Sequence, residues 1–145
     1  MQDGTRLKIL ESVMRAVKVG ALMLDHEQRI VLWNDWIEQH AQRQVDWSCG
    51  LAFVDAFPQM TNGRTHAAIR EALENNFPSV ISQTLNKAPF PFYCSGTDLA
   101  LDNRIQQAVE VIPIAVPGQQ RHCLIQIIDV SKTVMREKLL RRCRC

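Results

Sequence analysis

The sequence ends in an apolar segment that turns abruptly into a charged one. Residues 122–129 read His-Cys-Leu-Ile-Gln-Ile-Ile-Asp, whereas residues 136–145 hold five basic side chains and one acidic one. A short apolar run rich in isoleucine is typical of a buried strand, and a charged segment containing adjacent leucines is typical of an exposed helix. The sequence therefore predicts a core that ends in a strand. It also predicts a helix over 130–145 that leaves this core, which suits a module that passes something onward.

The two faces of this final strand are both largely apolar, because successive side chains alternate between them. Helices inserted in the middle of the chain can cover only one face, so the other face needs a second cover. The nearest candidate is an amphipathic helix at the N-terminus, from this chain or from a partner. We therefore expect a homodimer, with a dimer face made of Leu7, Leu10, Met14, Val17, Leu124 and Ile128.

The remaining segments complete an α+β pattern. Asn34 is expected to end the second strand and to cap the helix that follows it. The pattern predicts helices over 5–18, 35–40 and 64–76, short helical turns between 51 and 57, strands over 21–25, 30–33, 80–85, 105–114 and 122–129, and a loop over 86–103. This order describes an antiparallel sheet with helices on one face. The expected parts are an N-terminal helix (1–18), a core (19–129) and a C-terminal helix or linker (130–145).

Composition excludes several classes of protein. The chain has 145 residues, of which 46% are hydrophobic and 22% charged, as expected of one soluble domain. No apolar run approaches the ~18 residues of a membrane span, and the first residues lack the apolar centre of a signal peptide, so we expect a cytoplasmic protein. The five cysteines form no Cys-x-x-Cys motif, and we expect reduced thiols and no metal site. The basic end could touch nucleic acid or an anionic membrane, but a solvated helix face is the favoured interpretation.

Three motifs, in order, resemble the PAS family of small sensor modules over essentially the whole chain. The first is Gly20–Asp25 with Arg29–Asn34, similar to the opening hairpin of the family and its terminal asparagine. The second is Gly50 leading to Phe57-Pro58, and the third is Asp129–Ser131 followed by the charged helix. Two further stretches, 85–92 and 121–127, look most like PAS domains that precede GGDEF-type diguanylate cyclases, which make cyclic di-GMP.

The resemblance implies a five-stranded antiparallel sheet whose inner face and insert helices can enclose a small ligand. It implies a regulatory sensor of a bacterial signalling protein, paired through N-terminal helices, with a GGDEF output domain beyond the C-terminal helix. It assigns signal transmission to Asp129, Ser131 and Glu137, with capping of the final helix as the alternative role of Asp129. The expected pocket consists of Trp33, Asn34, Gln107, Val109, Val111, Cys123, Ile125 and Ile127. A filled core without ligand explains the same pattern, which leaves a purely structural dimerisation module as the alternative.

Catalysis and known cofactors find little support. There is no serine, histidine and carboxylate set, no glycine-rich phosphate loop and no Gly-Gly-Asp-Glu-Phe motif, so we expect no enzyme within these residues. His66 is the best axial ligand for haem, with His40 a poorer one, but a solvated His66 is the favoured interpretation. Cys49 lacks the neighbours of a blue-light flavin adduct, and non-covalent flavin would lie near Trp33 and Asn34. The cofactor is left unknown. A nucleic-acid binder using Arg141, Arg142 and Arg144 would need a groove-reading helix, which the sequence does not offer.

Overall fold

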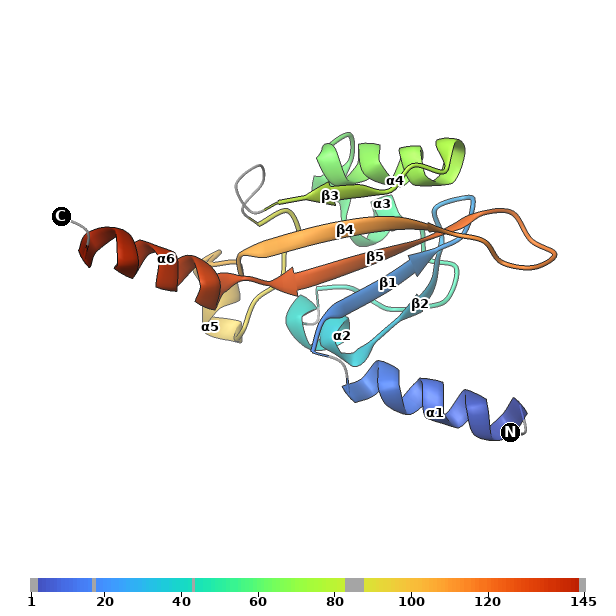
Figure 1. Cartoon of the computed structure of the whole chain (residues 1–145), viewed down its shortest axis with the longest axis horizontal. Coiled ribbons are helices and arrows are strands. Elements are labelled where there is room, and N and C mark those ends of the chain that lie inside the picture. Colours follow the sequence, from blue (N-terminus) through green and yellow to red (C-terminus); the bar gives the residue numbers. More distant parts are fainter. Residues whose placement is uncertain (1–2, 17, 43, 83–87, 144–145) are drawn as a thin grey trace.

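A five-stranded antiparallel sheet with helices on one face forms the centre of the molecule (Figure 1). The computed structural model describes residues 3–16, 18–42, 44–82 and 88–143. The elements are α1 (Asp3–Ala16), β1 (Gly20–Leu24), β2 (Ile30–Trp33), α2 (Asp35–Ala41), α3 (Phe53–Ala56), the 3₁₀ turn η1 (Pro58–Met60), α4 (Arg64–Asn75), β3 (Ser79–Ile81), α5 (Gly96–Ala100), β4 (Gln107–Ile114), β5 (His122–Asp129) and α6 (Ser131–Cys143). The predicted α+β fold is confirmed.

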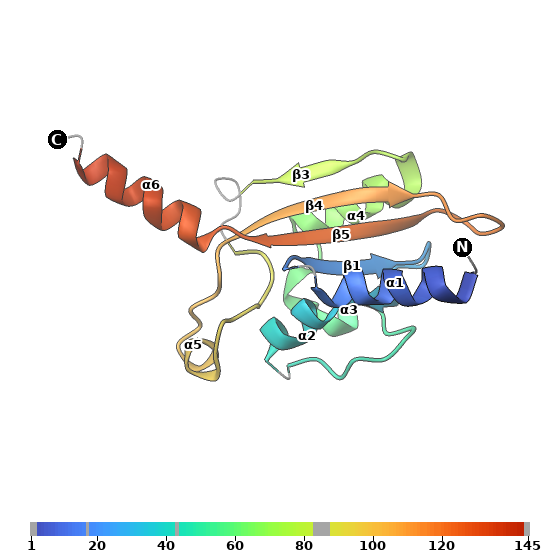
Figure 2. The same ribbon diagram turned by 60° about the horizontal axis from the view of Figure 1, so that its bottom comes forward.

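The strands follow the order β2-β1-β5-β4-β3, and every neighbouring pair is antiparallel. The longest ladder joins β4 to β5 along their full length, from Gln107 opposite Asp129 to Ile114 opposite His122. Helices α2 and α4 contact the strands, and with α3 they lie on one face of the sheet (Figure 1, Figure 2). Helix α6 projects away from the end at which β5 finishes, so the last strand leads directly into an exposed helix (Figure 1).

Local polar side chains determine how the first hairpin turns and ends. In the turn, the Asp25 carboxylate accepts hydrogen bonds from the backbone N–H groups of Glu27 and Arg29 at 2.9 and 3.0 Å. At the end of β2, the side-chain oxygen of Asn34 accepts from the Ile37 N–H at 3.3 Å, as an N-cap does. The predicted cap is therefore confirmed, and it joins the hairpin firmly to α2.

The core lies between the inner face of the sheet and the three helices. It contains four fully buried phenylalanines: Phe53 from α3, and Phe57, Phe90 and Phe92 from connecting segments. Burial of each such side chain stabilises the fold by roughly 1.5–3 kcal/mol. The packing is tight at Gly20 in β1, where an added Cβ would lie 2.7 Å from the Trp36 ring. Only glycine lets β1 approach α2 this closely.

The structure corrects three boundaries. Residues 86–103 are not all loop, because α5 forms at Gly96–Ala100, where the Ser95 hydroxyl accepts from the Asp98 N–H at 3.1 Å. The strand predicted over 80–85 is β3 at Ser79–Ile81, and residues 83–87 lie outside the described part. Strand β4 begins at Gln107 rather than at residue 105, because the Ile105 N–H donates to the Phe92 carbonyl instead of a neighbouring strand. Within the described ranges, no helix is both long and apolar enough to cross a membrane.

Candidate functional site

The inner face of the sheet carries most of the residues predicted to form a ligand pocket. Val109, Val111, Cys123, Ile125 and Ile127 are almost completely buried and belong to the hydrophobic core. The phenylalanine rings pack in front of this face at centroid distances of 5.1–6.2 Å from one another. Burial raises the pKa of the Cys123 thiol to about 12. The structure therefore places these residues in a filled core, and their role as ligand contacts stays a prediction.

Gln107 is the polar residue predicted for the same pocket, and its amide is fully buried. Its oxygen accepts from the Phe90 N–H at 3.0 Å, and its nitrogen donates to the carbonyls of Phe90 at 2.8 Å and Ile105 at 3.2 Å. Both amide protons are thereby used, which is all that this side chain can donate. In this structure, Gln107 connects the Phe90 segment to the beginning of β4.

Trp33 and Asn34 are the two remaining residues of the predicted pocket. The Trp33 indole N–H donates to the Glu38 carboxylate, and its ring stacks on Trp47 at 5.4 Å. Besides capping α2, the Asn34 amide accepts from the Ala21 N–H at 3.2 Å and donates to the Val19 carbonyl at 2.7 Å. Both side chains therefore support the corner between β2 and α2.

His66 is buried, so its interpretation as a solvated side chain is wrong. Its Nδ1 accepts from the Asn62 N–H at 3.0 Å, which leaves the proton on Nε2 to donate to the Gln28 side-chain oxygen at 2.9 Å. Burial, and secondarily the positive charge of Arg70, lower the pKa of His66. A haem iron would have to break one of these bonds. His40 binds the Trp36 carbonyl through Nδ1. Among the described residues, no three potential ligands are grouped to hold a metal ion.

The junction between β5 and α6 contains the residues predicted to transmit a signal. The Ser131 N–H donates to the Asp129 carboxylate at 2.9 Å, and the Ser131 hydroxyl accepts from the Gln106 N–H at 3.0 Å. In return, the Val130 N–H donates to the Gln106 carbonyl at 2.8 Å. The start of α6 is thus tied to the residue that precedes β4. Glu137 lies exposed further along α6. Asp129 thus accepts from the first N–H group of α6, as a helix cap does, and its role in signal transmission stays a prediction.

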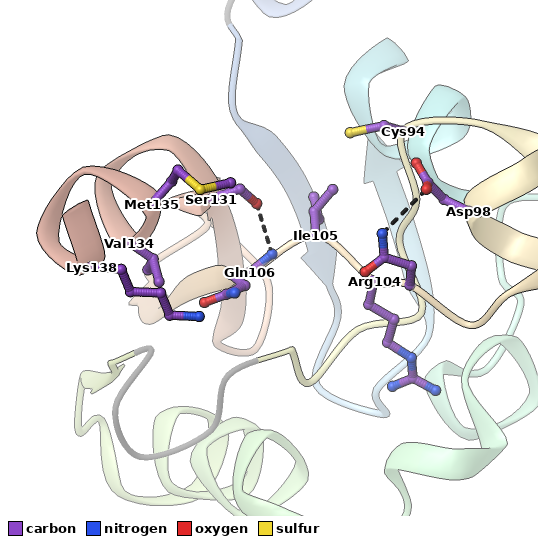
Figure 3. A pocket seen from close by; sticks show the side chains of 10 residues that line it. Cys94, Asp98, Arg104, Ile105, Gln106, Ser131, Val134, Met135 and Lys138 are labelled. Carbon is purple, nitrogen blue, oxygen red and sulfur yellow. Dashed lines mark hydrogen bonds between the residues drawn. The ribbon is translucent and has the colours of Figure 1, made fainter. Parts of the chain in front are cut away.

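A hollow of about 270 Å³ opens beside this junction, between the α5–β4 segment and the first turns of α6 (Figure 3). Its apolar lining comes from Ile105, Val134 and Met135, and Asp98 and Lys138 lie at its edge. Sequence reasoning missed this hollow, because two segments far apart in the chain meet there. The pattern Ser95-Gly-Thr-Asp98, a capping signal for α5, was the available clue.

Comparison with known proteins identifies the architecture. Neither a scan against protein-family models nor a search of the curated proteins found a match. Among solved structures, the chain is similar to a sensory box sensor histidine kinase from Vibrio cholerae, with 21% identity, a TM-score of 0.57, and coverage of 88% of this chain and 93% of that one. It is also similar to the PAS domain of BvgS from Bordetella pertussis, with 15% identity, a TM-score of 0.57, and coverage of 97% and 95%. The fold is that of a PAS domain.

A third PAS structure, from a Colwellia psychrerythraea protein, agrees, with 17% identity, a TM-score of 0.52, and coverage of 88% of this chain and 98% of that one. At such identities the likeness concerns the fold. It supports the PAS resemblance found in the sequence and leaves the association with GGDEF cyclases a prediction.

The outer face of this PAS sheet and helix α1 carry the predicted dimer face. Leu7 and Leu10 on α1 are 58% and 54% exposed, and Ile128 on β5 is 41% exposed. Met14 and Leu124 are half-buried, and Val17 lies outside the described residues. Helix α1 lies beside the β1–β2 side of the molecule and leaves its leucines open to solvent (Figure 1). The predicted pairing through this face stays a prediction.

Proposed function

We propose that this PAS-fold chain is a regulatory module of a bacterial signalling protein, which pairs with a second copy and controls an output domain joined to α6. The observation that carries the proposal is the uncovered apolar surface. On the outer side of the sheet, Leu32, Val80 and Ile128 are exposed, and α1 adds Leu7 and Leu10. Within the described part of the chain, no element packs over these side chains. Larger contiguous apolar patches usually mark interaction sites.

A second copy is the occupant that fits this surface best. The molecule offers two unpartnered apolar features, a helix stripe on α1 and a sheet face on β5 and its neighbours. A two-fold arrangement lets α1 of each copy lie against the sheet of the other, so that both features are buried twice. A stable interface typically buries about 800 Å² of accessible surface on each partner.

The proposed output path runs through α6. Its first turn is held to the core by the bonds between Ser131, Val130 and Gln106, so a rearrangement of the pair would change how α6 leaves the sheet. From the sequence resemblance, we propose a GGDEF-type diguanylate cyclase as the controlled domain. In this scheme residues 1–18 pair the copies, 19–129 form the PAS core and 130–145 carry the signal, with no enzyme within these residues.

A specific observation favours regulation without an internal ligand over the predicted ligand-binding form. The inner face is packed against four phenylalanine rings, and the Gln107 amide is engaged by backbone groups. A ligand on this face would have to displace those rings. Native mass spectrometry of protein purified from its own host, with an absorption scan, separates the two forms. Extra mass retained in the folded protein would favour the ligand-binding form.

Sedimentation velocity tests the pairing. We expect the parent chain to be a dimer, and Leu10→Glu or Ile128→Lys to raise the dissociation constant at least about a hundredfold, because an unpaired buried charge costs ~3–5 kcal/mol. Leu101→Glu is the matched control, since Leu101 is an exposed leucine on the α5 side, away from the outer face. A monomeric parent at micromolar concentrations, or charged variants that remain dimeric, would exclude this interface.

A further inference from the structure

We propose that the hollow at the base of α6 binds a small zwitterion with an apolar side chain, of the α-amino acid class, and that its occupant fastens α6 to the PAS core. The site is distinct from the pocket predicted on the inner face of the sheet. It also stands independently of the proposed pairing, because none of its lining residues belongs to the proposed dimer face.

Opposite charges lie on opposite sides of the hollow. Lys138 comes from α6, and Asp98 comes from α5 across the gap (Figure 3). Among the described residues, neither side chain takes part in a salt bridge, and Asp98 accepts only a 3.3 Å hydrogen bond from the Asn103 amide. A ligand carboxylate would meet the ammonium of Lys138, and a ligand ammonium would meet the carboxylate of Asp98. Such charge-assisted hydrogen bonds are the stronger kind.

The negative side extends beyond Asp98. The Cys94 thiol lines the hollow, and after burial the charges of Asp129 and Asp98 are what raise its pKa. Two carboxylates therefore act at the same place, and an ammonium group beside Cys94 would be attracted by both. The same potential repels a ligand carboxylate, which directs that group toward Lys138.

Arg104 does not compete for the ligand carboxylate. Its Nε donates to Tyr93 and Asp102, both at 3.4 Å, and its Nη1 donates to the Ala88 carbonyl at 3.3 Å. In Figure 3 the guanidinium points away from Asp98 and Cys94. Arg104 thus fixes the wall of the hollow, and Lys138 is left to select for negative charge.

The apolar lining and the volume limit the size of the ligand. Ile105 is buried beneath the hollow, and Val134 and Met135 form its α6 side. A volume of about 270 Å³ lies below the ~300–1,000 Å³ of sites for drug-sized molecules, so a small metabolite fits better. A molecule held by Asp98 and Lys138 at once would bridge the core and α6, which are otherwise joined through the contacts of Gln106.

A titration of the ¹⁵N-labelled chain with L-leucine, followed by NMR, tests the proposal. We expect amide shifts at Asp98, Ser131, Val134 and Lys138. Two analogues lack one charge each: 4-methylpentanoate has no ammonium, and 3-methylbutylamine has no carboxylate. Each should bind at least about tenfold more weakly than leucine, because it loses one charged hydrogen bond.

Two variants test which side chain binds the carboxylate of leucine and which binds its ammonium group. Lys138→Gln and Asp98→Asn should each weaken leucine binding about tenfold, and in Lys138→Gln leucine should bind no better than 3-methylbutylamine. Lys132→Gln, on the same helix outside the hollow, and Asp46→Asn, in an exposed loop, are matched controls that should bind as the parent does. No shifts at millimolar leucine, equal binding of a single-charge analogue, or full binding by Lys138→Gln would overturn the proposal.

Discussion

Replacing Gln107 by leucine distinguishes a filled core from a ligand pocket. The side chain is fully buried and makes three hydrogen bonds to the backbone of Phe90 and Ile105. If these bonds hold the Phe90 segment against β4, their loss must destabilise the fold. If the amide instead serves a ligand, the folded state without ligand gains little from it, and an apolar replacement should be neutral or stabilising.

The expected loss of stability follows from the backbone groups that would lose a hydrogen-bond partner in Gln107→Leu. The Phe90 carbonyl keeps a second partner, the Phe92 N–H at 2.9 Å, whereas the Phe90 N–H and the Ile105 carbonyl lose the Gln107 amide. Two buried orphaned groups cost about 2–6 kcal/mol, at ~1–3 kcal/mol each. Burial of the leucine side chain stabilises the fold by roughly 1.5–3 kcal/mol and offsets part of this cost. The net destabilisation should be about 2 kcal/mol, or a fall in Tm of roughly 4–8 °C for a chain of this size.

Urea unfolding followed by tryptophan fluorescence gives this difference directly. Gln126→Leu is the matched control, because it makes the same chemical change on the outer face of neighbouring β5, where the side chain is only half-buried. We expect the control to lie within about 0.5 kcal/mol of the parent. A Gln107→Leu variant as stable as the parent, or more stable, would refute the filled-core reasoning and restore the predicted pocket.

Three further changes have expected outcomes. Gly20→Ala should destabilise by about 1–3 kcal/mol, because its Cβ would lie 2.7 Å from an indole ring, whereas Gly96→Ala, with nothing within 4 Å, should not. Because the pKa of His66 is lowered in the folded state, the unfolded chain binds more protons below about pH 6.5. The free energy of unfolding should therefore fall as the pH drops from 7 through the folded-state pKa, and it should fall less in His66→Gln. Ser131→Ala should speed hydrogen exchange in the first turn of α6 about fivefold, since a hydrogen bond contributes ~1 kcal/mol, whereas the exposed Thr133→Ala should not.

Each of these three predictions has an outcome that would contradict it. Equal melting temperatures for the two glycine variants would mean that β1 can move away from α2. A parent chain whose stability is independent of pH between 7 and 5 would argue against the buried, neutral His66. Equal exchange rates in Ser131→Ala and Thr133→Ala would show that the hydroxyl does not hold α6 to the segment before β4.

The strands and the hairpin cap could be predicted because their signals are local. Residues 122–129 alternate around an apolar centre, and β5 has these same bounds. Asn34 follows an apolar strand and precedes a helical pattern, which is the place where a side-chain cap is needed. Such signals depend on a few neighbouring residues and on the alternation of side chains along a strand.

The filled core and the burial of His66 could not be predicted from such local signals. Pro89 and Pro91 mark an irregular segment, but nothing near them indicates that the rings of Phe90 and Phe92 turn inward. That placement depends on Gln107, which is distant in sequence. The burial of His66 likewise depends on the hairpin turn, through Gln28. Contacts of this kind appear only once the sheet has brought the segments together.

A filled PAS core still leaves a continuous path to α6. The Phe90 segment is bound by Gln107, and the preceding residue, Gln106, is bound by Val130 and Ser131 at the start of the helix. Two consecutive residues thus hold the core on one side and the exit helix on the other, so a shift of the β4 start must move both. A change of the proposed pairing at the outer face would act on β4 and β5 directly, and a ligand in the junction hollow would contact Gln106. The proposed control of α6 therefore does not require an internal cavity.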